Sequence, residues 1–195
     1  MKPANIWCIG RNYLDHAKEL GNKPPESHPI VFLKAGSSLQ QGSLLRWDPW
    51  ISEVHHEVEL ALVFGPNLEI AAGAIALDLT DRPTQNDLKS KSLPWTLAKS
   101  FRGACVVGKQ FPISDLDAVS RWEVSLSING QTRQHGQIKD MIFDCKTLAA
   151  YVQKHFPVLP GDLLLTGTPS GVGPLRSGDR LLAKIWNHSE EWTCS

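Results

Sequence analysis

Apolar residues in this chain gather in short runs that Gly, Pro, Asn and Asp separate from one another. Short apolar runs bounded by turn-forming residues are typical of β-strands. Asn129 and Gly130 stand between two of these runs and are the pair preferred in two-residue hairpin turns. Pro160 and Gly161 indicate a turn into the last run. The pattern predicts strands over residues 6–9, 30–33, 54–64, 75–79, 124–128, 131–136 and 163–166.

A few segments carry the pattern of short helices instead. Asn12 is a candidate N-cap of the first helix, and Gly21 is a candidate stop after it. Residues 22–28, which include two prolines, are expected to form a loop. No strand–helix–strand alternation is visible, so the pattern predicts an α+β fold that is rich in strands. The predicted helices span residues 12–20, 84–91 and 148–155.

Composition narrows the class of protein. The 195 residues suffice for one domain with a sizeable core. Twenty basic residues balance twenty acidic ones, which gives no reason to expect a nucleic-acid or membrane-surface partner. No apolar run approaches the ~20 residues of a membrane span or suits a signal peptide. The four cysteines form no C-x-x-C pair, so we expect reduced thiols in a soluble, cytoplasmic protein.

The predicted strand over residues 54–64 carries the most informative acids. Alternate side chains of a strand share a face, so His55, Glu57 and Glu59 should point one way. Three interpretations compete: a solvated face, carboxylates paired with Lys or Arg, and a site for a hard cation. The apolar continuation over residues 60–64 weakens the first, because a deeply buried strand seldom begins with unneutralised acids. An oxygen-rich site would select Mg²⁺, Mn²⁺ or Ca²⁺ over zinc, but the spacing leaves the choice open.

Longer motifs follow one another along the chain. They cover residues 8–13, 55–60, 78–80 and 93–101, then Asn129 and Gly130 with Gln134, and finally residues 140–143 and 160–169. In this order they resemble the fumarylacetoacetate hydrolase superfamily, specifically its branch of small acylpyruvate hydrolases and oxaloacetate decarboxylases. The resemblance extends over about residues 6–175. It implies a mixed β-sheet rolled into a barrel-like fold with a few short helices. It also implies a single catalytic domain over residues 1–195, a lid segment over about 11–38, and a homodimer.

The resemblance further implies an Mg²⁺ or Mn²⁺ ion and a set of catalytic side chains. The metal ligands would be Glu57, Glu59 and Asp78. The catalytic residues would be Lys99, which faces the substrate, and the lid pair His16 and Glu19. Three carboxylates around a dication leave a net charge of about −1, which a lysine can offset. His16 and Glu19 lie at positions i and i+3 of the predicted helix, so the acid can orient the imidazole as a base. Without the resemblance, such a pair is more often a surface pair.

Four further residues are candidates for binding the substrate. They are Arg11, Arg82, Gln85 and Thr168. Thr168 lies in the glycine-rich segment 166–173, whose small residues allow backbone N–H groups to approach an anion. The alternative for that segment is an ordinary tight turn, and the alternative for Arg82 and Gln85 is a surface loop. His55 and His56 adjoin the acids, but an oxygen-ligated ion does not require them, so we assign them supporting roles.

Two departures from the family pattern stand out. Pro83 replaces a second acid that usually follows the metal-site aspartate, and Asp81 stands where alanine is usual, which should alter the loop there and puts the role of Arg82 in doubt. The tail over residues 185–192 also differs and has no functional interpretation.

The resemblance implies metal-dependent C–C bond hydrolysis of a short acylpyruvate, such as acetylpyruvate or fumarylpyruvate. The presence of both lid residues favours this reaction mildly. The alternatives are oxaloacetate decarboxylation and isomerisation of an unsaturated oxo-dicarboxylate in aromatic catabolism. A more remote alternative is a catalytically silent metal-binding protein of the same fold. All the enzymatic alternatives take a small-molecule 2-oxo or 2,4-dioxo acid as partner.

Overall fold

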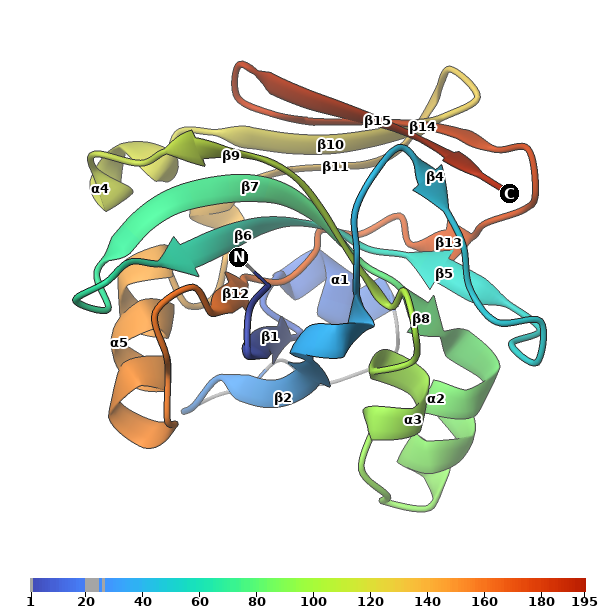
Figure 1. Ribbon diagram of the computed structural model, residues 1–195, viewed down its shortest axis with the longest axis horizontal. Helices are drawn as coiled ribbons and strands as arrows, with labels where there is room; N and C mark the ends of the chain where they lie inside the picture. Colours follow the sequence, from blue (N-terminus) through green and yellow to red (C-terminus); the bar gives the residue numbers. More distant parts are fainter. Residues whose placement is uncertain (1, 20–24, 26) are drawn as a thin grey trace.

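The computed structural model describes residues 2–19, 25 and 27–195, which form three sheets with short helices at their edges (Figure 1). The seven-stranded sheet has the order β2 (Ile30–Ala35), β1 (Asn5–Gly10), β12 (Leu163–Leu165), β6 (Val58–Phe64), β7 (Ile70–Asp78), β9 (Cys105–Pro112) and β3 (Leu39–Gln40). The five-stranded sheet has the order β11 (Gln131–Gln137), β10 (Glu123–Ile128), β14 (Arg180–Ile185), β15 (His188–Cys194) and β4 (Leu44–Leu45). The three-stranded sheet has the order β13 (Gly173–Pro174), β5 (Val54–His56) and β8 (Thr80–Asp81).

The helices of the described residues are short. They are α1 (Leu14–Glu19), α2 (Arg82–Ser90), α3 (Thr96–Lys99), α4 (Leu116–Val119) and α5 (Cys145–His155), with 3₁₀ turns at Gly36–Ser38 and Ile138–Asp140. Strands β1 and β12, β3 and β9, and β15 and β4 pair in parallel, while the other pairs are antiparallel. The predicted strand-rich α+β fold with a curved mixed sheet is therefore confirmed.

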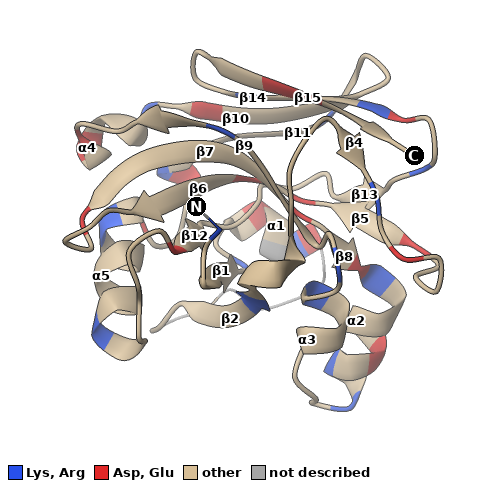
Figure 2. Cartoon of the chain, viewed as in Figure 1, with Lys and Arg blue, Asp and Glu red and all other residues tan. Residues whose placement is uncertain are grey.

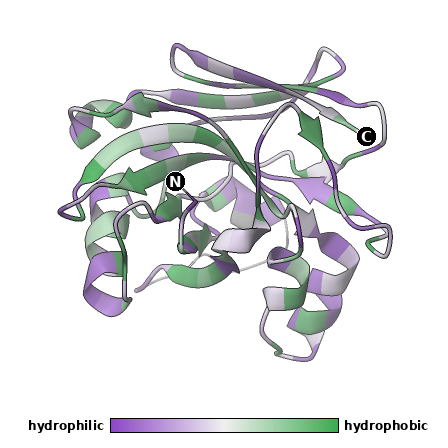
Figure 3. Ribbon diagram, viewed as in Figure 1, coloured by the Kyte–Doolittle hydropathy of each residue, from purple (hydrophilic) through white to green (hydrophobic). Residues whose placement is uncertain are grey.

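Strand β6 is apolar on both faces because each face packs into a hydrophobic core. Leu60 and Leu62 belong to the larger hydrophobic core, which also contains Leu126 of the five-stranded sheet. Ala61 and Val63 belong to a smaller core on the opposite face. Figure 3 shows the contrast with β10, where hydrophobic and hydrophilic residues alternate along the strand. The sequence analysis predicted one continuous strand over residues 54–64, which is wrong. The structure has two strands there, β5 and β6, which belong to different sheets and meet at Glu57.

The predicted hairpin over β10 and β11 is confirmed. Asn129 has φ 51° and Gly130 has φ 79°, as the favoured two-residue turn requires. A second hairpin, β14–β15, completes the same sheet and was not predicted. Its turn begins at Trp186, which also has a positive φ and whose ring stacks on Trp122 with centroids 5.1 Å apart. The divergent tail thus forms part of the fold.

The start of α2 explains the departure at Pro83. Asp81 is the N-cap, and its side chain accepts a hydrogen bond from the Thr84 backbone N–H at 3.1 Å. Proline is tolerated in the first helical turn, where its missing N–H has no intrahelical partner. These residues therefore form the start of a helix, which begins two positions earlier than predicted, and not a loop. Whether the segment differs from that of relatives stays a prediction.

The assignment of Asn12 as an N-cap is also wrong. Asn12 is fully buried, and its side-chain amide donates to the carbonyls of Phe143 and Thr166. Its oxygen accepts a hydrogen bond from the Phe143 N–H at 2.9 Å. Asn12 thus holds the residues just before α1 against the segments that contain Phe143 and Thr166. The predicted stop at Gly21 and most of the predicted loop over 22–28 lie outside the described residues.

Charge and thiols agree with the sequence analysis. Basic and acidic residues are interspersed over the elements visible in Figure 2. All four cysteines are buried and free. None of the described helices is both long enough and apolar enough to cross a membrane.

Candidate metal centre

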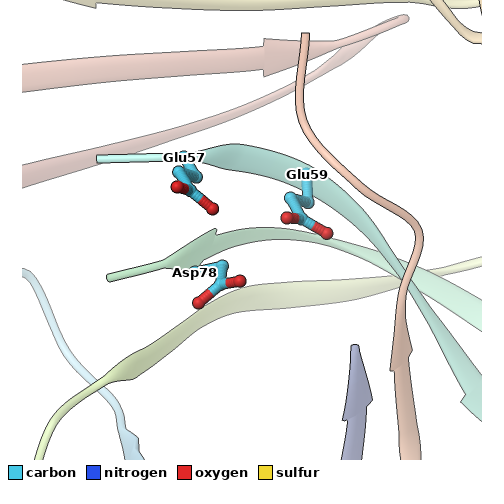
Figure 4. Close-up of side chains that lie close together, drawn as sticks. All are labelled: Glu57, Glu59 and Asp78. Carbon is cyan, nitrogen blue, oxygen red and sulfur yellow. The ribbon is translucent and has the colours of Figure 1, made fainter. Parts of the chain in front are cut away.

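Three carboxylates meet where the seven-stranded and three-stranded sheets separate. Glu57 lies at the junction of β5 and β6, Glu59 lies on β6, and Asp78 ends the neighbouring strand β7. The Asp78 N–H donates to the Glu57 carbonyl at 2.9 Å, which fixes the two backbones side by side. One oxygen from each carboxylate lies within 4.8 Å of the other two (Figure 4). All three side chains are buried, so their charges need compensation.

The pKa values of Glu59 and Glu57 respond to burial and to the charged groups around them. Burial and the charges of Asp78 and Glu57 raise the pKa of Glu59 well above its usual value. Burial also acts to raise the pKa of Glu57, but the positive charges of Lys99 and Arg82 outweigh it and hold that pKa far below its usual value. Three buried carboxylates that meet at one point form an all-oxygen donor set, which suits a hard divalent cation such as Mg²⁺ or Mn²⁺. The residues therefore fit the ion that the sequence analysis expects.

Lys99 ends helix α3 and points at the acids. Its ammonium lies 2.8 Å from Glu57 Oε2, 2.8 Å from Asp78 Oδ2 and 2.6 Å from the Thr80 hydroxyl. Burial acts to lower the pKa of Lys99, but the charges of Asp78 and Glu57 outweigh it, and the pKa is raised. The side chain therefore remains an ammonium that donates hydrogen bonds.

Lys34 is a residue of this centre that the sequence analysis missed. It lies on β2 and is fully buried, with its ammonium 2.7 Å from Asp78 Oδ1. It also donates to the carbonyls of Leu79, Ala104 and Lys99. The available signal was a lysine directly after the apolar run over 30–33, because strand β2 continues through that lysine to Ala35.

Arg82 and Gln85 lie on α2 and face the same centre. Arg82 donates to the Glu57 carboxylate and, at 2.7 Å, to Gln85 Oε1. Both side chains are buried, so the surface-loop alternative is wrong. Arg82 also contacts His55, whose other ring nitrogen lies 2.9 Å from Glu53 Oε1.

His16 and Glu19 form the pair that helix geometry predicts. His16 Nδ1 lies 3.3 Å from Glu19 Oε2, and the His16 ring is buried against the pocket. Burial lowers the pKa of His16, although the charges of Glu57 and Glu19 partly oppose the shift. The imidazole is therefore neutral at pH 7 and able to accept a proton.

The glycine-rich segment binds carboxylates of the chain itself. The Gly167 N–H donates to Glu59 Oε2 at 2.6 Å, and the Gly171 N–H donates to both oxygens of Glu19. Gly171 has φ 96°, and a Cβ there would lie 1.9 Å from the Arg133 carbonyl oxygen, so only glycine fits. The segment thus holds one predicted metal ligand and one residue of the predicted base pair.

Thr168 borders the pocket but has committed its hydroxyl proton. It donates to the Val58 carbonyl at 2.8 Å and accepts from Gln134 Nε2 at 2.8 Å. The hydroxyl therefore has no proton left to donate to a substrate carboxylate. The same glutamine holds His56 through a 2.9 Å contact to its Nδ1, and neither His55 nor His56 belongs to the acidic cluster within the described residues.

These side chains enclose a small pocket of about 30 Å³. Arg11, predicted to bind substrate, lies on its wall, and its Nε is buried without a hydrogen-bond partner among the described residues. The lining consists of Ile9, Gly10, Arg11, His16, Phe32, Glu57, Glu59, Asp78, Arg82, Gln85, Lys89, Trp95, Lys99 and Thr168. The fold thus brings every predicted site residue to one pocket except Glu19, which reaches it through His16.

Comparison with known proteins shows which family of proteins the chain resembles. Residues 5–191 match the family model described as fumarylacetoacetate (FAA) hydrolase C-terminal. The chain is 38% identical over 192 residues to the mitochondrial oxaloacetate tautomerase FAHD1 of Bos taurus, which covers 93% of this chain and 86% of the bovine protein. It is 42% identical over 188 residues to the mitochondrial oxaloacetate decarboxylase of Dictyostelium discoideum, covering 89% of this chain and 84% of that one.

A solved structure extends the likeness to the fold. Fumarylpyruvate hydrolase from Pseudomonas aeruginosa, crystallised with Mn²⁺ and pyruvate, superposes with a TM-score of 0.90 at 27% identity. The alignment covers 98% of this chain and 89% of that one. The chain belongs to the fumarylacetoacetate hydrolase family.

Proposed function

We propose that the chain is a divalent-metal-dependent enzyme that forms the enol or enolate of oxaloacetate or a closely similar 2-oxo dicarboxylic acid. The observation that carries this proposal is the arrangement of Lys99 between Glu57 and Asp78, with the neutral His16 on the same pocket wall. A protonated donor and an unprotonated base beside a cation site suit enolisation next to a keto group. The relatives that act on oxaloacetate support this substrate over an acylpyruvate.

Each residue has a distinct role in this proposal. Glu57, Glu59 and Asp78 would hold Mg²⁺ or Mn²⁺, which when bound supplies Lewis-acid polarisation of the 2-keto oxygen. Lys99 would redirect one of its three N–H groups, which donate to Glu57, Asp78 and Thr80 in the structure, toward the oxygen on which negative charge develops. His16 removes a proton from the carbon next to the keto group, and the proton returns to oxygen or carbon to complete tautomerisation. Decarboxylation forms the same enolate as CO₂ leaves, so it requires Lys99 but no base.

A second candidate is hydrolysis of an acylpyruvate. The 3.3 Å contact between His16 and Glu19 suits activation of water as well as removal of a proton from carbon. The structural likeness to a fumarylpyruvate hydrolase favours keeping this candidate. It differs from the first because water must attack the distal carbonyl, so acetylpyruvate would be consumed.

The first experiment compares these reactions in the metal-loaded protein. We expect Mn²⁺-loaded protein to accelerate the change in ultraviolet enol absorbance of oxaloacetate, or the formation of pyruvate from it, and EDTA to abolish both. Loss of acetylpyruvate absorbance without any effect on oxaloacetate would favour the hydrolase. A folded, Mn²⁺-binding protein that changes none of these rates would contradict the enzymatic proposal.

Replacing His16 by alanine should separate the reactions. Because general base catalysis contributes about 10²–10⁴-fold, we expect His16→Ala to slow tautomerisation of oxaloacetate by about that factor. Decarboxylation should persist at a substantial fraction of the wild-type rate, while any acetylpyruvate hydrolysis should disappear. His135→Ala is the matched control, since that side chain is exposed on β11 outside the pocket. Equal loss of all activities in His16→Ala would contradict the assigned role.

The lid over residues 11–38, the cytoplasmic location and the homodimer stay predictions. The names of the bovine and Dictyostelium relatives place those proteins in mitochondria. Light scattering of the purified chain, with or without Mn²⁺, would test the dimer.

A further inference from the structure

The pocket contains more basic side chains than its acids neutralise. Arg11, Arg82, Lys89 and Lys99 line it together with three carboxylates. Arg82 pairs with Glu57, and Lys99 pairs with Glu57 and Asp78. Within the described part of the chain, Arg11 and Lys89 form no ion pair with any carboxylate. Two positive groups of the wall are therefore available to an anionic ligand.

Lys89 is held at the pocket by helix α2. It follows Gln85 by four residues and Arg82 by seven, so the three side chains share one helical face. Its ammonium lies 5.3 Å from the ring centroid of Trp95, another lining residue. The contact with an aromatic face holds the cation in place without neutralising its charge.

The surroundings of Lys89 show that it lacks an anion. Burial and the positive charges of Arg82 and Arg11 lower the pKa of Lys89 to about 8. Arg11 adds a guanidinium whose Nε is buried without a partner among the described residues. Both groups line the same pocket, and a ligand carboxylate is the kind of anion with which each forms charge-assisted hydrogen bonds.

We propose that Lys89 and Arg11 form a second carboxylate-binding subsite in this pocket, which selects 2-oxo dicarboxylic acids over 2-oxo monocarboxylic acids. The inference deepens the proposed function and rests on it for the position of the 2-oxo group. With a divalent cation bound, the four basic and three acidic lining side chains leave three surplus positive charges. A dicarboxylate offsets two of them, whereas a monocarboxylate offsets one. Lys89 is thus the residue that distinguishes oxaloacetate from a compound such as pyruvate.

The test measures binding, so that it does not depend on turnover. Oxomalonate and pyruvate, a dicarboxylic and a monocarboxylic 2-oxo acid, are titrated calorimetrically into the Mn²⁺-loaded protein. Hydrogen bonds to charged groups correspond to about a ten- to hundredfold change in affinity. We expect Lys89→Met to weaken oxomalonate binding by about that factor and to leave pyruvate binding unchanged. Lys89→Arg should retain the preference, because it keeps the charge.

The control is Lys91→Met, which removes an exposed lysine near the end of the same helix that pairs with Asp87 outside the pocket. It should bind both probes as the wild type does. Equal weakening of both probes in Lys89→Met, or no change in either, would overturn the subsite. Turnover of oxaloacetate with an unchanged KM in Lys89→Met would overturn the subsite while leaving the proposed function intact. If Lys89→Met weakened binding of oxomalonate alone, but the wild type did not turn over oxaloacetate, the subsite would stand and the proposed function would fail.

Discussion

Glu59→Gln is expected to bind Mn²⁺ on the order of a hundredfold more weakly than the wild type and to lose metal-dependent activity. Even residues that only orient ligands change metal affinity by about 10–100-fold, and Glu59 supplies a donor oxygen directly. The amide has nearly the same size, and its oxygen can still accept the hydrogen bond from the Gly167 N–H. The loss should therefore reflect the missing charge. Calorimetric titration with Mn²⁺ measures it.

Stability should change in the opposite direction in the metal-free protein. Burial and the charges of Asp78 and Glu57 make a carboxylate unfavourable at position 59, so a neutral amide relieves repulsion there. We expect the variant's Tm without metal to equal or exceed that of the wild type. At the same Mn²⁺ concentration, the Tm of the wild type should rise by more than that of Glu59→Gln, because stabilisation by a bound ion falls as its affinity falls.

Glu53→Gln is the control, because this acid is half-exposed and its carboxylate pairs with His55, outside the pocket, among the described residues. It should bind Mn²⁺ like the wild type. If Glu59→Gln retained wild-type affinity for Mn²⁺, the three carboxylates would not be the metal site.

The local part of the site could be predicted from the sequence. Alternation in a strand places Glu57 and Glu59 on one face, and the apolar run after them indicates burial. Asp78, Lys99 and His16 could be added only through the family resemblance, because they come from distant segments. Their meeting depends on the pairing of β6 with β7 and on where α1 and α3 end, which no local pattern specifies.

The residues that sequence reasoning missed show the same limit. Lys34 and Lys89 look like ordinary surface lysines in a linear sequence. Lys34 is buried because β2 pairs with β1 in the large sheet, and Lys89 reaches the pocket because it lies on the same face of α2 as Arg82 and Gln85. Both roles follow from packing between elements.

The fold was predictable where a turn had a recognised chemistry. Asn129 and Gly130 gave the hairpin β10–β11 correctly. The hairpin β14–β15 escaped because it turns at Trp186, a bulky residue that rarely adopts positive φ. The parallel pair β1–β12 joins segments at opposite ends of the chain, so their pairing leaves no periodic signal in either strand.

Lys34→Met is expected to cause the largest loss of stability of any single change considered. The ammonium is fully buried beside Asp78 and donates to three backbone carbonyls. Its removal takes away one of the two lysines that neutralise Asp78, leaving Lys99, and leaves several buried acceptors without this donor. Breaking a buried ion pair by removing one partner costs about 3–5 kcal/mol. For a chain of this size, that corresponds to a fall in Tm of about 6–20 °C. Thermal and urea unfolding of the metal-free protein measure the effect.

The control and a double variant separate the ion pair from loss of packing. Lys154→Met alters an exposed lysine of α5 and should leave the Tm unchanged. Adding Asp78→Asn to Lys34→Met should cost less than the sum of the two single changes, because the two side chains form one ion pair that either substitution alone already breaks. Additive effects would show that Lys34 acts through packing and its carbonyl contacts alone. A Tm of Lys34→Met within about 2 °C of the wild type would contradict the role of Lys34 as the internal counterion of Asp78, since even the smallest expected loss exceeds that value.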